Sequence, residues 1–387
     1  MPLFKDLSTN LNKILMQIEK SKIQLENTIS SGKTSIRNIK DVNLNIKDLK
    51  INNDKSNKAF EESKLSSIKL FNKIDNYLEN PTPEKALKVK NQINVSNNDL
   101  VKANNVFSEN KTLADKVVVS FNRYKNDDFI NNVEKSIKLK QKLIDSFKKN
   151  IKIIRSFSKL KTKFKSREVY SSESPTPSPA CQELKQDLAD KEKERKSFQE
   201  KIDKDYLLIA ATIPIAQKNK DEYEKQTSYE DTAIKAKEDY VELQKEVLAK
   251  YNEIQKEIED KNKEIEKSYM QLGKIIINDP SIKAIKNIFL TIKRINFERD
   301  LKLSQLEKAI QNLGSANKQS IDELEKITKT ARQIFKEKNK DIFNKMVDSQ
   351  NVIKEAEKEI KFNKGVVHNY DISIMFINIF IKIACPS

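Results

Sequence analysis

The sequence predicts an all-α fold, an elongated helical bundle that contains a long antiparallel coiled-coil hairpin. Apolar residues recur at alternating spacings of three and four, which is the pattern of helices with a narrow apolar seam. The 387 residues include only 4 glycines and 9 prolines. Charged residues make up 34% of the chain and hydrophobic residues 37%, a balance that suits thin bundles with much surface per residue.

The scarcity of glycine predicts few and long elements. Average glycine usage is roughly 7%, because globular proteins need it for tight turns and for close backbone approach to ligands. A chain with 4 glycines has few such turns. The sequence is also too apolar and too periodic for general disorder.

The first predicted helix runs from about Leu3 to Asn80. Every seventh residue along it is usually apolar, with Gly32, Asn53 and Ser67 as the exceptions. One register kept over about ten heptads predicts a single long helix. The apolar members of the series are Phe4, Leu11, Ile18, Leu25, Ile39, Ile46, Phe60 and Ile74.

Two further helices are expected in the first half. Pro81-Thr82-Pro83 ends the first helix, because proline cannot continue it and disfavours helical geometry in the residue before it. Thr82 can cap a second helix that has Pro83 at its first position. Asn126-Asp127-Asp128 marks a break, and a third helix begins near Phe129. Short connections between three helices predict a basic three-helix bundle over residues 1–168.

The second half is predicted to begin after a Pro/Ser-rich linker at residues 169–181, where three prolines stand at alternate positions. Residues 182–365 then predict a coiled-coil hairpin. Its heptad series begins at Tyr240, and Asn278-Asp279-Pro280-Ser281 provides the turn.

Gly365 is expected to stop the last helix, because glycine is the usual residue just past a helix end. An apolar C-terminal tail at residues 366–387 follows it.

No motif for catalysis, a cofactor or a metal is found in the chain, so we expect a non-enzymatic protein without a small-molecule substrate. Ser31-Gly32-Lys33-Thr34 imitates the end of a phosphate-binding loop, but Asn27 stands where that motif needs glycine, and the segment reads as helix surface. General acid–base catalysis, catalytic triads and many zinc sites most often use histidine. The chain has one histidine, His368, which stands beside the C-terminal tail and is read as incidental.

The two cysteines, Cys181 and Cys385, have no metal or redox spacing. A disulfide between them is conceivable but is not indicated by the sequence. The N-terminus shows no apolar secretory signal. We therefore expect a cytoplasmic or peripheral membrane protein, with signal-less export as an open alternative.

The net charge of +17 favours anionic partners. The positive charge is concentrated at residues 131–167, which contain 13 Lys or Arg and only two acidic residues, Glu134 and Asp145. This basic amphipathic segment is either a bundle helix with a solvated face, a contact with an anionic membrane, or a contact with nucleic acid or acidic protein. The candidate residues are Lys148, Lys149, Lys152, Arg155, Lys159, Lys161, Lys163, Lys165 and Arg167.

Two apolar stretches, Leu207–Ala216 and Ile372–Ala384, are candidates for apolar contact, the second interrupted by Asn378 and Lys382. Both are shorter than the about 20 residues that a spanning helix needs. The first is expected to be a packed helix kinked at Pro214, or an element exposed in only one state. The second can dock on a bundle or partner, touch a membrane, or add a strand to a partner's sheet. The candidate residues are Ile374, Phe376, Ile377, Phe380, Ile381, Leu207, Leu208 and Ile213.

We therefore expect a coiled-coil scaffold or tether that contacts itself or a protein partner through helices, with an anionic membrane as a further candidate partner. One alternative is a membrane-active protein, since long bundled helices with short apolar segments resemble the α-helical pore-forming toxins in outline. That resemblance transfers no residue role, and the lysine-bearing tip Lys274–Arg294 suits insertion poorly. A non-specific nucleic-acid-binding coiled coil is the third hypothesis.

Overall fold

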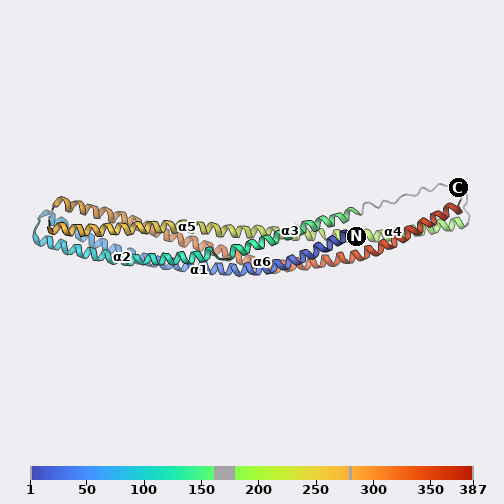
Figure 1. Cartoon of the computed structure of the whole chain (residues 1–387), viewed down its shortest axis with the longest axis horizontal. Helices are drawn as coiled ribbons and strands as arrows, with labels where there is room; N and C mark the ends of the chain where they lie inside the picture. Colours follow the sequence, from blue (N-terminus) through green and yellow to red (C-terminus); the bar gives the residue numbers. More distant parts are fainter. Residues whose placement is uncertain (1, 161–178, 279–280, 386–387) are drawn as a thin grey trace. The chain divides into compact units, whose positions relative to one another are not determined.

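A computed structural model describes residues 2–160, 179–278 and 281–385, apart from the side chains of residues 158, 160 and 334–336 (Figure 1). Every regular element in these residues is an α-helix, which confirms the predicted all-α helical bundle. The longest helix has 103 residues and is about 155 Å long at 1.5 Å per residue. The helices are α1 (Pro2–Glu79), α2 (Pro83–Lys125), α3 (Phe129–Leu160), α4 (Pro179–Ala210), α5 (Ile213–Asn278) and α6 (Ile282–Ala384).

The predicted register of α1 is confirmed by burial. All apolar members of the seven-residue series are buried, Leu11 and Ile39 among them. The exceptions to the series, Gly32, Asn53 and Ser67, are buried as well. The helix therefore keeps one inward face throughout, even where that face is polar or lacks a side chain.

The helix ends lie where the capping residues predict them. The Thr82 side chain accepts a hydrogen bond from the Lys85 backbone N–H at 3.3 Å, and Pro83 begins α2. Asp127 accepts from the Phe129 N–H at 3.1 Å, which satisfies a donor at the start of α3. Each cap supplies an acceptor to a helix N-terminus whose first N–H groups have no partner within the helix.

The break in Leu207–Ala216 differs from the expected kink at Pro214. α4 ends at Ala210 and α5 begins at Ile213, so that the proline is the second residue of a new helix. Proline has no N–H and its ring clashes with the carbonyl four residues earlier, which here belongs to Ala210. Thr212 lies in the break between the two helices, and its hydroxyl donates a hydrogen bond to the Ile209 carbonyl at 2.7 Å.

The predicted helix stop at Gly365 is wrong, because α6 continues as a helix to Ala384. No glycine in the described residues has a positive φ, so Gly365 takes ordinary helical geometry. Glycine lowers helix stability without preventing a helix when the flanking residues favour it. In the described chain, residues 372–384 are helical and form no strand.

The described chain divides into two compact units. Unit 1 contains residues 1–28, 131–231 and 330–387, and unit 2 contains residues 29–130 and 232–329. Both units draw helices from before and after the predicted linker, most of which lies outside the described residues. The predicted division follows the order of the chain, whereas each compact unit combines separate segments of it. The predicted parts were residues 1–168, 169–181, 182–365 and 366–387.

The core of unit 1 joins α1, α3, α4, α5 and α6. Phe157 of α3 lies between Phe4 and Tyr206, with ring centroids at 4.6 and 6.2 Å respectively. Ile360 and Val367 of α6 belong to the same buried cluster. Residues that are distant in sequence thus share one apolar core.

Unit 2 places many polar side chains inside its packed helices. Asn52 donates to the Asn110 side chain at 2.8 Å, and Gln244 donates to the Leu313 carbonyl at 3.1 Å. In the predicted hairpin, α5 and α6 run antiparallel, as the ion pairs Lys261–Glu298 (2.7 Å) and Lys302–Glu257 (2.5 Å) show. Such polar contacts fix the relative register of the helices, because a shifted register would leave buried groups unpaired.

Glycine substitutions test the close packing of α1 in unit 2. A methyl group added at Gly314 lies 3.9 Å from Ile46, whereas one added at Gly32 lies 3.1 Å from the Thr328 hydroxyl. Since glycine in a helix is about 1 kcal/mol less favourable than alanine, Gly314→Ala should raise the free energy of unfolding by about 0.5–1 kcal/mol. Gly32→Ala should gain less or lose stability. Urea unfolding followed by circular dichroism measures both, and equal gains would contradict the close approach at Gly32.

Alkaline unfolding tests the burial of the unit 2 tyrosines. Burial raises the pKa of the Tyr124, Tyr240, Tyr251 and Tyr269 hydroxyls above the ordinary value. The folded state therefore keeps protons that the unfolded state loses above about pH 10, so stability falls as the pH rises, by up to about 1.4 kcal/mol per pH unit for each group. Absorbance at the phenolate band should show these groups ionising only as the helical signal disappears.

The control for this titration is Tyr251→Phe. The Tyr251 hydroxyl is buried without a hydrogen-bond partner in the described structure, so its removal should change stability at neutral pH by less than about 1 kcal/mol. The pH midpoint of alkaline unfolding should rise. Ionisation of all tyrosines near pH 10 with the helices intact would contradict their burial.

Candidate interaction surface

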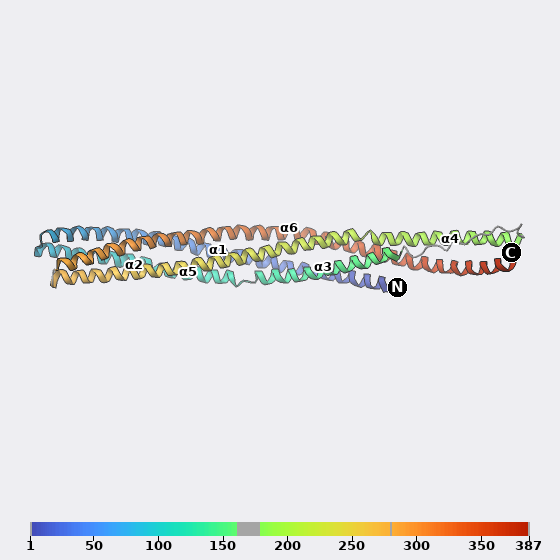
Figure 2. The same ribbon diagram turned by 90° about the horizontal axis from the view of Figure 1, so that it is seen from above.

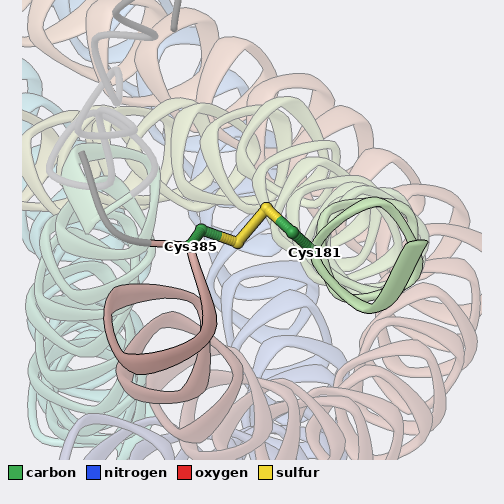
Figure 3. The surroundings of a disulfide bond; sticks show 2 residues. All are labelled: Cys181 and Cys385. Carbon is green, nitrogen blue, oxygen red and sulfur yellow. A yellow bond between two sulfur atoms is a disulfide. The ribbon is translucent and has the colours of Figure 1, made fainter. Parts of the chain in front are cut away.

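Parts of two helices of unit 1 lie together, and we call this pair the C-terminal arm: residues Pro179–Phe198 of α4, and Tyr370–Ala384 of α6 with the Cys385 that follows it. A disulfide joins Cys181 to Cys385, with the Cα atoms 5.6 Å apart (Figure 3). Further along the pair, Arg195 forms an ion pair with Asp371, and the Phe198 and Tyr370 rings stack at 5.9 Å. The two helices are therefore antiparallel and held at both ends of the arm.

Most side chains of the arm are exposed among the described residues. In both views of the ribbon, the described parts of α1 and α3 end before the disulfide, so α4 and α6 lie beside each other there without them (Figures 1 and 2). A two-helix pair can bury only one stripe on each helix. In α6 that stripe contains the buried Ile377 and the half-buried Ile374 and Ile381.

The outer side of α6 in the arm is apolar and exposed. Its residues follow one another at spacings of one, three or four, which places them on one side of the helix. Their exposed fractions run from 39% for Ile372 to 73% for Ile383. We call this set the apolar face; it contains Ile372, Met375, Phe376, Ile379, Phe380 and Ile383.

Sequence reasoning selected only part of this face. Phe376 and Phe380 were candidates and lie on it, whereas Ile377 faces inward. The other four residues were missed because the tail was separated from the preceding helix at Gly365. Counting by threes and fours through that glycine finds the whole face.

The second apolar segment forms no comparable face. Leu207 and Leu208 are 54% and 46% exposed, while their neighbours Tyr206 and Ile209 are buried in unit 1. Ile213 packs against the same core. Two adjacent exposed leucines cover a short patch and not a stripe along the helix.

The basic segment lies on α3 with its apolar side already buried. Lys148, Lys149 and Lys152 are exposed, as are Arg155 and Lys159. The isoleucines and phenylalanines between them pack into the core of unit 1. This helix can offer charge to an anionic surface, but its apolar side is not available for insertion. Lys161, Lys163, Lys165 and Arg167 lie outside the described residues.

One lysine of this segment points inward. Lys140 is buried and forms an ion pair with Glu230 at 2.6 Å, and Ser136 donates to the same carboxylate at 2.7 Å. Burial lowers the pKa of Lys140 to about 8 and raises the pKa of Glu230, because both charges lose water. Lys140 therefore belongs to the packing of α3 on α5.

The described residues hold no group of three or more His, Cys, Asp or Glu side chains that could bind a metal. His368 is exposed on α6. Within the same residues, α6 is the one helix with an 18-residue stretch apolar enough to cross a membrane by length and composition, and 11% of that stretch is buried. No family model, curated protein or solved structure matches the chain.

The Lys140–Glu230 pair gives a stability test. Lys140→Met leaves a buried carboxylate without its partner and should lower the free energy of unfolding by about 3 kcal/mol or more. Adding Glu230→Leu should restore most of that loss, since the unpaired charge is removed. The matched control is the exposed pair Lys345–Asp341, where Lys345→Met should change stability by less than about 1 kcal/mol. Additive losses in the double variant would contradict the pairing.

Proposed function

We propose that the chain is a non-enzymatic scaffold or tether that acts through contacts of its helices. The observation that carries this proposal is the different use of two apolar surfaces. The heptad positions of the helices are buried inside the units, whereas the apolar face of the C-terminal arm is exposed. The packed helices supply a support, and the arm supplies a surface for contact.

The size of the exposed face supports a role in binding. Single exposed apolar residues are common on soluble proteins, but a contiguous set marks an interaction site. The apolar face has two phenylalanines, a methionine and three isoleucines along about three turns of α6. Aromatic and methionine side chains are enriched where proteins contact partners. Coiled-coil self-association remains part of this proposal.

The disulfide favours one kind of cellular compartment for such a tether. Disulfides persist in oxidising compartments and are rare in the reducing cytoplasm. The Cys181–Cys385 bond therefore favours the exported alternative over the cytoplasmic one. We propose that the protein acts at the periphery of a membrane on its oxidising side.

A membrane-active function is the second candidate. It is favoured by the membrane-length apolar stretch in α6 and by its small buried share of 11%. Opposing it, Asn378 and Lys382 interrupt the most apolar run, and the charged helix α4 is joined to it by the disulfide. The scaffold is therefore preferred.

Site-specific photo-crosslinking in the cells that produce the chain tests the scaffold. A photoreactive phenylalanine analogue replaces Phe376 on the apolar face, and in a matched variant it replaces Phe297, which is 66% exposed in unit 2. Crosslinks are expected at position 376 and to be several-fold weaker at 297. Equal yields at the two positions would show that the arm is not a preferred contact surface.

A further inference from the structure

We propose that the outer side of α6 between Lys354 and Ile383 is a docking surface for an anionic phospholipid membrane, on which the helix lies in the plane of the interface. This inference rests on the proposed tethering function and names what the arm contacts. It is carried by three features: the order of basic and apolar residues along one side, the internal pairing of the polar groups, and the helix joined to α6 by the disulfide.

The first feature is a continuous line of exposed residues. Starting at Lys354 and moving by three or four positions, the line crosses three lysines, then Gly365 and His368, and then the apolar face. All of its members are exposed. The line reads Lys354, Lys358, Lys361, Gly365, His368, Ile372, Met375, Ile379 and Ile383.

This order matches the layers of a membrane surface. Lysines are attracted to an anionic leaflet, and apolar side chains of an interfacial helix enter the boundary between headgroups and acyl chains. Phe362 is 65% exposed between the two parts of the line. Glu355, Glu357 and Glu359 accompany the lysines on this stretch, so the apolar face supplies most of the affinity and the lysines adjust it.

The second feature concerns the polar side chains of the apolar stretch. Asn378 donates to the Ile374 carbonyl at 2.9 Å, and Ser373 donates to the Asn369 carbonyl at 3.0 Å. The donors of both side chains are therefore paired within their own helix. A lipid interior offers no hydrogen-bond partner, and a helix whose polar side chains are internally paired can enter it at lower cost.

The third feature limits how deep the helix can go. The disulfide joins the end of α6 to α4, whose arm residues include the exposed Lys185, Asp187 and Lys193. Carrying such charges through the hydrocarbon is expensive. The most apolar run is also interrupted by the polar Asn378 and the charged Lys382. Docking by one side satisfies both constraints, with Lys382 extending its ammonium group toward the headgroups.

Tryptophan fluorescence provides a direct test, because the chain contains no tryptophan. Phe376→Trp in the full, oxidised chain reports from the apolar face, and Phe297→Trp in unit 2 is the matched control. The vesicles consist of phosphatidylcholine, alone or mixed with phosphatidylserine. The emission of the Phe376→Trp variant is expected to shift to shorter wavelength on the mixed vesicles, and that of the Phe297→Trp variant to stay unchanged. No shift in the Phe376→Trp variant would overturn the proposal.

Brominated lipids then measure depth. Bromines close to the headgroup should quench the fluorescence of the Phe376→Trp variant more than bromines near the bilayer centre. Stronger quenching from the centre would replace interfacial docking by insertion. Light scattering without lipid tests for a second copy of the chain. Twice the mass of one chain, with the emission of the Phe376→Trp variant already at shorter wavelength than that of the Phe297→Trp variant, would show a second copy on the apolar face and overturn the lipid assignment.

Substitutions separate the two halves of the line. Phe376→Asp with Phe380→Asp should weaken binding to the mixed vesicles about a hundredfold, since two apolar anchors are lost. Lys354→Gln, Lys358→Gln and Lys361→Gln together should remove about a tenfold preference for the anionic lipid and leave binding to phosphatidylcholine unchanged. Equal loss on both vesicle types in the lysine variant would contradict the basic half of the proposal.

All five positions are exposed, and circular dichroism checks that the variants keep their helices. The photo-crosslinks at position 376 separate the two proposals. Crosslinks to protein without vesicle binding would end the lipid assignment and leave the tether standing. The absence of crosslinks to protein and to lipid at position 376 would end both the tether proposal and the lipid assignment.

Discussion

The structure depends on the narrowness of the apolar seam. A helix that buries about two residues in seven must find a neighbour along its whole length, because no part of it can form a core alone. In unit 1 this need is met where five helices share the cluster around Phe157. Where α1 and α3 end, α4 is the neighbour of α6 among the described residues (Figure 2), and the outer residues of α6 are exposed. The candidate interaction surface thus arises from the same rule that builds the core.

Polar residues inside the bundle favour one register of its helices. A seam of isoleucine and leucine alone permits sliding by a heptad, whereas buried asparagines and charges pair in one register. Asn52 with Asn110, and Lys140 with Glu230, are pairs of this kind. Arg299 is fully buried over the Phe60 ring at 4.8 Å, where a shift of one turn would remove its aromatic contact. Long helices of simple composition need such contacts to define one register.

The sequence predicted what depends on local chemistry. Helical periodicity, the Thr82 cap and the break before Phe129 could be read because each involves residues a few positions apart. Gly365 was misread because a residue preference was taken for a stop signal. The arm and its disulfide could not be derived, since residues 204 positions apart meet only through the packing of α4 on α6. Which side of α6 stays exposed likewise depends on where other helices end.

The disulfide also changes how the chain carries load. It closes residues 182–384 into a covalent ring whose two ends meet at one bond. If the chain is held at Cys385 and pulled from any point before Cys181, tension crosses the sulfur atoms and bypasses the ring. α5 and α6 then carry no tension along their backbones. Their noncovalent packing is protected from mechanical unfolding while the bond is intact, and reduction places every one of their residues in series with the load.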